Sequence, residues 1–406
     1  MTRKTAADAQ TSLFDPAPAA PEAGAGVGAD VADAAGVGET AAPAAHAPTR
    51  SVRAPMPTIG VASPAHPFLK QAAEHLPPSV HLGTSSWSFP GWQGLLYDRA
   101  HTTTALAHGG LSAYAAHPLM RTVGIDRSFY APLTIEEYRA YAAQVPAAFR
   151  FLVKAPAAVC DAALRGARGV PTRANPDFLN ADLAAETFVT RCLAGLGVHA
   201  GPMVFQLSPL TDAQLADPAA LIDRLGQFFA ALPPLEDDAR ARGVCYALEL
   251  RDASLLTPRL IRMLRERRVR YCLGVHARMP DVARQAAALQ MLDAPEVPVG
   301  SATAPIPHPL PTPAVDPRPL IVRWSLHAGM RYEGAKDRYA PFDAIVDADL
   351  PTRQALAALI LRYLAAGQSS FVIVNNKAEG SSPLSCGWLA SALAALCGVA
   401  PEIQAG

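Results

Sequence analysis

From residue 80 onward, short apolar segments alternate with longer segments in which apolar residues recur every three or four positions. The short segments indicate strands, and some, such as Phe371–Val374, are apolar throughout, as expected of a parallel sheet covered by helices on both faces. We predict strands at Val80–Ser85, Thr122–Phe129, Phe149–Lys154, Pro202–Leu207, Val244–Leu250, Val269–Val275, Leu320–Leu326 and Ser370–Val374. We predict helices at Thr104–His117, Thr134–Gln144, Ala181–Ala194, Pro218–Ala231, Pro258–Arg267, Val282–Met291, Thr352–Ala366 and Leu384–Cys397. Each predicted strand is thus followed by a helix.

Repeated strand–helix units favour one closed (β/α)₈ barrel, the TIM-like fold of the α/β class, over about residues 80–400. The main competitor is an open, doubly wound sheet. No Gly-x-Gly-x-x-Gly motif follows the first strand, as many dinucleotide-binding open sheets require. The pattern therefore predicts a barrel, and no cofactor is expected.

Two segments do not fit the repeat. Residues 1–57 are rich in Ala, Pro and Gly and have few large side chains, so they cannot bury enough apolar surface to offset the entropy of ordering. We predict a disordered tail. Residues 293–319 are rich in proline, which removes backbone donors and predicts an extended loop. This insertion joins the sixth helix to the seventh strand, at the non-catalytic face of a barrel.

Composition narrows the class of protein. The 35 Lys and Arg residues balance 35 Asp and Glu residues, which argues against bulk electrostatic binding to nucleic acid. No run of about 18 apolar residues predicts a membrane span. The N-terminus lacks the apolar core of a secretory signal. The six cysteines show no Cys-x-x-Cys pairing, so they indicate reduced thiols of a cytoplasmic protein.

Polar side chains gather at the predicted carboxyl ends of the strands, where barrels carry their chemistry. Glu249 and Arg251 are two positions apart and share a face, as do Arg323 and His327. The set that converges on the mouth is mainly cationic: Lys154, Gln206, Glu249, Arg251, Arg323, His327 and one of Asn375 and Asn376.

Two interpretations of this set stay open. It is a site for a small anion, with Arg251 and Arg323 supplying forked donors, or it is a structural network that neutralises Glu249 inside the barrel. In the first case Glu249, His327 and Lys154 are the candidate catalytic residues. We expect a cation to hold Glu249 ionised, which leaves His327 as the better proton carrier near neutral pH.

The aromatic residues Trp87 and Tyr130 are predicted to wall the site, whereas Trp92 is equally well explained as packing. A metal site needs about three ligands within reach. Asp126, Glu249 and two histidines, His276 and His327, are the candidates, and their spacing does not support a metal site. The first strand also lacks the Gly-x-Ser-x-Gly elbow of serine hydrolases.

A series of short motifs resembles the YecE-like family of unknown function. In family order they are Gly83-Thr-Ser-Ser-Trp87 with Trp92, Phe129-Tyr130, Phe149-x-Phe151-x-x-Lys154-x-Pro156, Gln206-Leu207, Glu249-x-Arg251, Arg323-x-x-x-His327 and Asn375-Asn376. Each match is weak alone, but together they run from residue 80 to about 398 in register. The resemblance implies a TIM barrel of uncharacterised activity.

Three departures from the family pattern bear on activity. Gly124-Ile-Asp126 stands where the family has Glu-x-Asn, and Cys160-Asp161 lies where a His usually follows the third-strand Lys. The His-Gly after the seventh strand is His327-Ala-Gly329. If the missing groups belong to a shared site, the resemblance implies an altered or lost activity.

One short motif interrupts the tail. Gln10-Thr-Ser-Leu13-Phe14 contains the only Leu and Phe of the first fifty residues. It resembles the bacterial sliding-clamp binding motif, in which a Gln precedes a Leu-Phe pair that fills an apolar pocket, although Thr11 stands where Leu is common. The alternative is a chance Leu-Phe pair in a biased segment.

Three functional hypotheses follow. The protein is an acid–base enzyme acting on a small phosphorylated or carboxylated compound, or a binding protein on a barrel scaffold without catalysis. Alternatively, it is an accessory protein of DNA replication or repair, recruited to the clamp by Gln10–Phe14. Fold alone does not choose between them, because barrels support many unrelated chemistries.

Overall fold

The structure of the chain, a computed structural model, describes residues 58–166, 171–294, 317–327, 330 and 332–399. The tail of residues 1–57, which carries the Gln10–Phe14 motif, lies outside the described residues, as does most of the proline-rich segment 293–319. The predictions made for both segments therefore stay predictions.

Eight parallel strands close into a barrel, which confirms the predicted fold class. Around the barrel the order is β1-β10-β9-β8-β7-β6-β3-β2. The strands are β1 (Val80–Thr84), β2 (Thr122–Ile125), β3 (Arg150–Lys154), β6 (Ala200–Gln206), β7 (Tyr246–Glu249), β8 (Arg270–Val275), β9 (Leu320–Trp324) and β10 (Ser370–Val374). A separate antiparallel hairpin, β4 (Ala163–Arg165) and β5 (Pro171–Ala174), follows β3.

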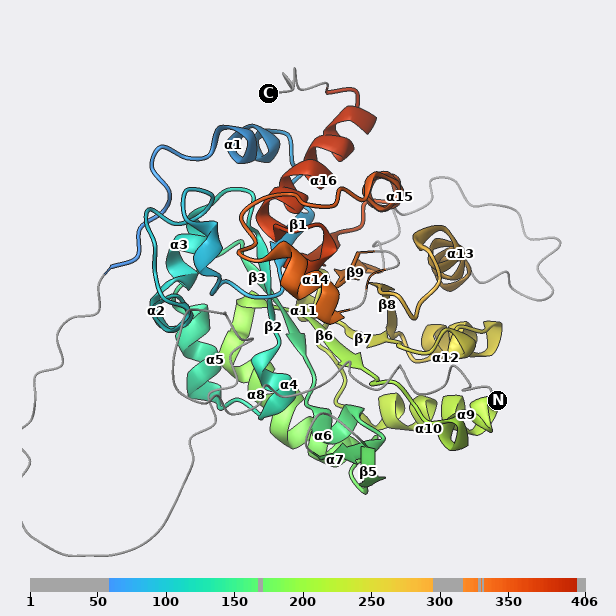
Figure 1. Cartoon of the computed structure of the whole chain (residues 1–406). Helices are drawn as coiled ribbons and strands as arrows, with labels where there is room; N and C mark the ends of the chain where they lie inside the picture. Colours follow the sequence, from blue (N-terminus) through green and yellow to red (C-terminus); the bar gives the residue numbers. More distant parts are fainter. Residues whose placement is uncertain (1–57, 167–170, 295–316, 328–329, 331, 400–406) are drawn as a thin grey trace, which may run out of the picture.

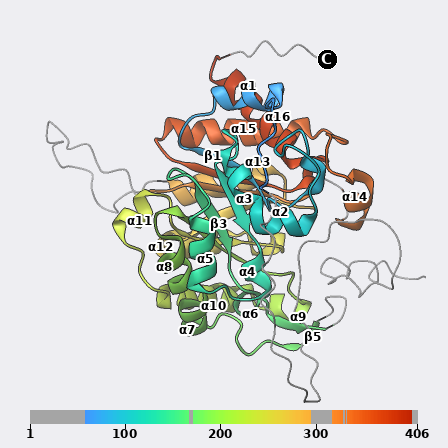
Figure 2. The same ribbon diagram turned by 90° about the vertical axis from the view of Figure 1, so that its left-hand side faces the viewer.

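Helices surround the barrel, as Figures 1 and 2 show. Those that lie at the predicted helix positions are α2 (Thr103–Gly109), α3 (Leu111–Ala116), α5 (Ile135–Ala142), α8 (Thr190–Leu196), α10 (Pro218–Ala231), α12 (Pro258–Glu266), α13 (Val282–Asp293), α15 (Leu350–Ala365) and α16 (Ser382–Leu396). In Figure 1 the series α10, α12, α13, α15 and α16 follows one side of the barrel, while α5 and α8 pack together on the other. Among the described helices none is long and apolar enough to cross a membrane.

Several further elements are not among the predicted ones. The helix α1 (Pro67–Glu74) precedes the barrel and packs on α16, where the Phe68 and Trp388 rings lie 4.6 Å apart. The others are α4 (Arg127–Tyr130), α6 (Ala157–Cys160), α9 (Asp212–Leu215), α11 (Asp237–Ala241), α14 (Tyr332–Tyr339) and the single turns Pro90–Trp92, Gly197–His199, Ala253–Leu255 and Asn376–Ala378. The predicted helix Ala181–Ala194 is observed as α7 (Ala181–Ala184), a turn at Ala185–Val189 and α8 in direct succession.

The predicted second strand is too long. β2 ends at Ile125, and the next residues form the helical turn α4. The Ser128 hydroxyl donates to the carbonyls of Ile125 (3.0 Å) and Lys154 (2.6 Å), which holds the turn against the end of β3. The predicted helix Thr104–His117 is likewise wrong as one element, because it divides at Gly110 into α2 and α3.

The barrel interior is apolar in its middle and polar at its carboxyl end. Seven buried residues fill the middle: Leu152, Val204, Cys245, Ala247, Cys272, Ile321 and Ile373. Gly83 lets the backbones of β1 and β2 approach closely, since a Cβ at this position would lie 1.8 Å from the Thr122 carbonyl oxygen. Because side chains alternate along a strand, the next inward positions on β3, β6, β7 and β9 belong to polar residues.

Candidate functional site

The inward positions at the carboxyl ends of four strands carry the polar cluster. Lys154 is two positions beyond the interior residue Leu152, and Gln206 is two beyond Val204. The register pairs Gln206 with Glu249, and Arg323 with Gly274 on the neighbouring strand. Period-two alternation and strand register therefore bring these side chains to one level of the barrel.

Glu249 is the centre of the cluster and is fully buried. Arg251 Nη2 lies 2.7 Å from its Oε1, and Arg323 Nη1 lies 2.7 Å from its Oε2. Burial alone would raise the pKa of Glu249, but the charges of Arg251 and Arg323 and the hydrogen bond from Arg323 hold the pKa below its ordinary value. Glu249 is therefore a carboxylate at neutral pH, clamped between two guanidinium groups.

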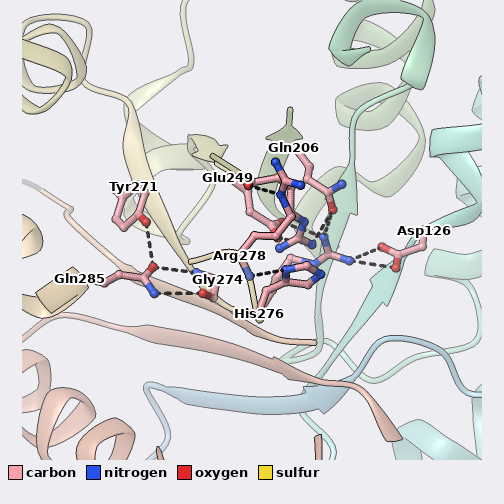
Figure 3. Close-up of polar contacts among 10 residues, drawn as sticks. Asp126, Gln206, Glu249, Tyr271, Gly274, His276, Arg278 and Gln285 are labelled. Carbon is pink, nitrogen blue, oxygen red and sulfur yellow. Dashed lines mark hydrogen bonds and ion pairs between the residues drawn. The ribbon is translucent and has the colours of Figure 1, made fainter. Parts of the chain in front are cut away.

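Arg323 also reaches Asp126, the first residue after β2. Its Nη2 lies 2.9 Å and 3.2 Å from the two carboxylate oxygens of Asp126 (Figure 3). Burial opposes the charge on Arg323, yet the Asp126 and Glu249 carboxylates raise its pKa above the ordinary value. The Asp126 side chain is 33% exposed, so it forms the outer edge of the cluster.

Gln206 joins the two arginines. Its Oε1 accepts hydrogen bonds from Arg251 Nη2 at 3.1 Å and from Arg323 Nη1 at 2.8 Å. With its oxygen so engaged, the amide Nε2 is buried and finds no acceptor among the described residues. Gln206 therefore fixes both guanidinium groups while leaving one donor unused.

Lys154 differs from the two arginines. Its Nζ lies 3.5 Å from the centroid of the Phe129 ring, and in the part of the chain that the structure describes it makes no hydrogen bond or ion pair. Burial lowers its pKa to about 8, although the Asp126 carboxylate favours the charged form. Lys154 therefore stays mainly charged at pH 7, with about a tenth of the amine neutral.

The cluster holds more donors than acceptors. Arg251 Nε and Nη1, Arg323 Nε and Gln206 Nε2 are buried donors to which no described residue offers an acceptor. Three cationic side chains, Lys154, Arg251 and Arg323, face two carboxylates. Buried polar groups are normally paired, so this arrangement has capacity for an added anion with several acceptor oxygens.

Neighbouring residues keep the cluster in place. Arg278 Nε donates to the Arg251 carbonyl at 3.0 Å, and its Nη2 lies 2.7 Å from Asp252 Oδ1. The side-chain amide of Gln285, on α13, bonds both backbone groups of Gly274 on β8, as Figure 3 shows. A Cβ at Gly274 would lie 3.4 Å from Arg251 Nη1, so the glycine leaves space beside the guanidinium.

Two histidines follow the strands near the cluster. His276, drawn in Figure 3, has its pKa lowered to about 3 by burial and by the charge of Arg251, so it is neutral at neutral pH. His327 lies beyond the end of β9, where its backbone N–H donates to the Lys377 carbonyl at 2.9 Å. The ion pairs that the structure describes for Glu249 are with Arg251 and Arg323, and neither histidine takes part in them.

The two predicted asparagines have different surroundings. Asn375 Nδ2 donates to Ser85 Oγ at 2.9 Å, which joins the ends of β10 and β1 at the mouth. Asn376 Oδ1 instead accepts from the backbone N–H and the hydroxyl of Ser382, at 2.9 and 2.7 Å. Asn376 therefore fastens the start of α16, and only Asn375 lies at the mouth.

The predicted aromatic walls also differ from each other. Trp87 is buried, and its ring packs edge-on against Tyr141 of α5 at 5.3 Å. Tyr130 is 67% exposed and packs edge-on against Phe129 at 5.5 Å. Tyr130 thus borders the ring beneath Lys154, whereas Trp87 contributes to the packing between the barrel and α5.

Sequence reasoning left three contributors out of the site. Asp126 was considered only as a departure from a family motif and as a metal ligand, while Phe129 and Arg278 were not assigned to the site. The available signal for Asp126 was its two-residue spacing from Gly124. The described residues contain no group of three or more His, Cys, Asp or Glu side chains that could hold a metal ion.

Comparisons with known proteins give a family. The family model described as "Protein of unknown function DUF72" matches residues 81–404. No curated protein matches the chain. Among solved structures, a DUF72 family protein from Enterococcus faecalis V583 is 16% identical, with 77% of this chain and 95% of that one covered and a TM-score of 0.45.

A DUF72 family protein from Thermotoga maritima MSB8 is 14% identical, with 76% of this chain and 97% of that one covered and a TM-score of 0.46. The family match extends over all eight strands except the first residue of β1. The expectation of an uncharacterised family with a barrel fold is confirmed. The chain belongs to the DUF72 family of proteins of unknown function.

Proposed function

We propose that the carboxyl-end mouth of the barrel binds a small molecule that carries a phosphate or carboxylate group. The observation that carries this proposal is the set of unpaired buried donors around Glu249: Gln206 Nε2, Arg251 Nε and Nη1, and Arg323 Nε. Unpaired donors in a protein interior cost free energy unless a ligand or water accepts from them. An oxyanion offers several acceptors at once.

The charge balance supports an anion over a neutral ligand. Glu249 and Asp126 offset two of the three cations, and the remaining positive charge is that of Lys154, which has no paired carboxylate of its own among the described residues. A purely structural network would be expected to pair all its charges, because a buried unpaired charge is costly. Arginine forks also match the geometry of phosphate and carboxylate oxygens.

Within this site we assign proton transfer to Lys154. A group that exchanges protons in catalysis works best when its pKa lies near the working pH, and burial lowers the pKa of Lys154 to about 8. Glu249 is held as a carboxylate and so serves to position Arg251 and Arg323. His327 stays a second candidate at the rim of the mouth. If proton transfer is absent, the same site supports a binding protein.

A thermal-shift screen tests the proposed ligand class. Phosphorylated and carboxylated metabolites are compared with uncharged analogues, because a ligand that binds the folded state raises the melting temperature by mass action. We expect stabilisation by anionic compounds, and we expect it to weaken in Lys154→Met. Equal shifts from charged and uncharged compounds, or equal shifts in both proteins, would contradict the proposal.

A second proposal concerns the tail. We propose that Gln10–Phe14 binds the bacterial sliding clamp, since Leu13 and Phe14 form the only large apolar pair in the first fifty residues. Such a role is compatible with the barrel being either an enzyme or a binding protein.

We also propose a cytoplasmic location, because the five cysteines numbered 160, 192, 245, 272 and 386 are buried free thiols.

A further inference from the structure

Lys154 is as buried as the other cations of the mouth, Arg251 and Arg323, but it lacks their polar partners and lies over an aromatic ring. It is inside the barrel with 7% of its surface exposed, it has no hydrogen-bond or ion-pair partner among the described residues, and its nitrogen lies over the Phe129 ring. We infer that Lys154 is a nucleophile that forms an imine with an aldehyde or ketone group of the anionic ligand. This inference rests on the proposed anion site and names the class of compound that fills it.

The position of Lys154 is fixed from both sides. The Ser128 hydroxyl donates to its backbone carbonyl at 2.6 Å, so α4 and the end of β3 are joined at this residue. Phe129, in the same turn, lies under the side chain with 3.5 Å between Nζ and the ring centroid. The amine is therefore held at the edge of the polar cluster, beside donors that would bind the anionic end of the ligand.

The charges that face Lys154 come from three strand ends. Asp126 after β2 and Glu249 on β7 favour the ammonium form, whereas Arg323 on β9 and Arg251 after β7 disfavour it. Burial is the largest effect, and the pKa of Lys154 falls to about 8. About a tenth of the amine is then neutral at pH 7, compared with less than a thousandth for an ordinary lysine. Only the neutral amine attacks a carbonyl carbon.

The step balances without a further reactant. The lone pair of neutral Lys154 Nζ forms a bond to the carbonyl carbon, and the C=O π electrons move to oxygen. The proton lost by nitrogen passes to that oxygen, which gives a carbinolamine. The nitrogen lone pair then forms the C=N bond as the hydroxyl takes a second proton from solvent and leaves as water, and the resulting iminium nitrogen returns its remaining N–H proton to solvent. Amine and carbonyl thus give imine and water, and hydrolysis reverses the step.

The remaining lysines provide internal controls. The chain has five lysines, of which Lys70 is exposed on α1, Lys336 lies on α14 and Lys377 is buried after β10. Lys4 lies outside the described residues. Lys70 has no comparable surroundings, so its rate of modification measures ordinary surface reactivity in the same molecule.

Reductive trapping tests the inference. The full chain is incubated at pH 7 with glyoxylate, glyceraldehyde 3-phosphate or the uncharged glycolaldehyde, each with sodium cyanoborohydride, and modified peptides are quantified by mass spectrometry. We expect the two anionic carbonyls to modify Lys154 at least tenfold faster than Lys70. We expect glycolaldehyde to show a smaller preference and inorganic phosphate to slow the modification of Lys154 alone.

The outcomes separate this inference from the proposed function. If phosphate binds the protein but Lys154 is modified no faster than Lys70 by every compound, the imine is excluded and the anion site stands. If Lys154 reacts equally fast with charged and uncharged carbonyls and phosphate does not compete, the anion site is excluded. Lys154→Arg, which keeps the positive charge, must lose the modification at this position while Lys70 reacts as before.

Discussion

Arg323 Nη1 donates to Glu249 Oε2 at 2.7 Å, although β8 lies between their strands. The contact is possible because Gly274, the residue of β8 beside Arg323 in the sheet, has no side chain to fill the space. The same carboxylate is held on its other oxygen by Arg251. The mouth is therefore organised around one buried anion shared by two cations.

Removing one cation should destabilise the fold. Arg323→Met leaves Asp126 without its partner and Glu249 with only one, and breaking a buried ion pair typically costs about 3–5 kcal/mol. We expect a loss of this order in the free energy of unfolding, measured by urea denaturation. The matched control is Arg259→Met, which removes an exposed pair with Asp223 and should cost less than about 1 kcal/mol. Similar losses in the two variants would contradict the description of the cluster.

Removing Lys154 should have the opposite effect. Lys154→Met keeps the packing on Phe129 and removes a buried charge without depriving any described residue of a hydrogen bond. We expect the variant to be more stable than the wild type at pH 7 in the absence of ligand. Thermal unfolding checks this, with Lys70→Met on the exposed face of α1 as the control. A lower melting temperature for Lys154→Met would show that the ammonium is satisfied in the free protein.

The pH dependence of this difference follows from the lowered pKa of Lys154. Below about pH 8 both folded and unfolded chains carry the proton, and the folded state bears the cost of the buried charge. Between about 8 and the ordinary value of 10.5 the folded state loses the proton while the unfolded state keeps it. Unfolding then takes up a proton, so the stability of the wild type rises with pH, by about 3 kcal/mol at most. The difference in free energy of unfolding between Lys154→Met and the wild type should therefore become smaller as the pH rises over this range. A difference that stays constant with pH would contradict the lowered pKa of Lys154.

The space at Gly274 can be tested by side-chain size. A Cβ there would be in ordinary contact with Arg251 Nη1 at 3.4 Å, so Gly274→Ala should fold with nearly unchanged stability. Gly274→Leu would occupy the volume that the guanidinium uses. We expect it to lose anion binding and to be less stable by about 1–3 kcal/mol, in the range of overpacked interiors. Equal behaviour of the Ala and Leu variants in urea denaturation and phosphate titration would show that the space is not needed.

The tail motif makes a separate prediction. A peptide containing Gln10–Phe14 should bind the bacterial sliding clamp weakly, because a peptide loses conformational entropy on docking. Fluorescence anisotropy with the peptide and its Leu13→Ala/Phe14→Ala version measures this directly. The doubly substituted peptide should lose binding at least tenfold. Indistinguishable curves from the two peptides would end the proposal.

Much of the site can be predicted from the sequence, because side chains along a strand alternate between the inside and the outside of the barrel. Within a regular strand, this alternation puts Glu249 on the inner face, and the ends of β3, β6 and β9 carry Lys154, Gln206 and Arg323 to the same level, whereas Arg251 lies two residues beyond the end of β7. The apolar strands and amphipathic helices likewise predict a barrel from the sequence alone.

Other parts depend on contacts that alternation does not encode. Asp126 is not assigned to the site from the sequence because the predicted second strand extends to Phe129, yet the chain turns into α4, where the Ser128 hydroxyl finds carbonyl acceptors from two strands. Beyond Trp324 the strand has ended, so spacing no longer fixes the direction of His327. Asn375 and Asn376 are adjacent and chemically identical, and only the start of α16 distinguishes the one that binds Ser382.

The most direct test of the central claim is calorimetric titration of inorganic phosphate into the wild type, Lys154→Met and Arg259→Met at pH 7. The unpaired donors and the excess positive charge of the mouth predict saturable binding to the wild type and an unchanged affinity in Arg259→Met, whose substitution lies on the exposed surface of α12. They predict at least a tenfold weaker affinity in Lys154→Met. Absence of binding to the wild type, or the same dissociation constant in all three proteins, would contradict an anion site at the mouth of this barrel.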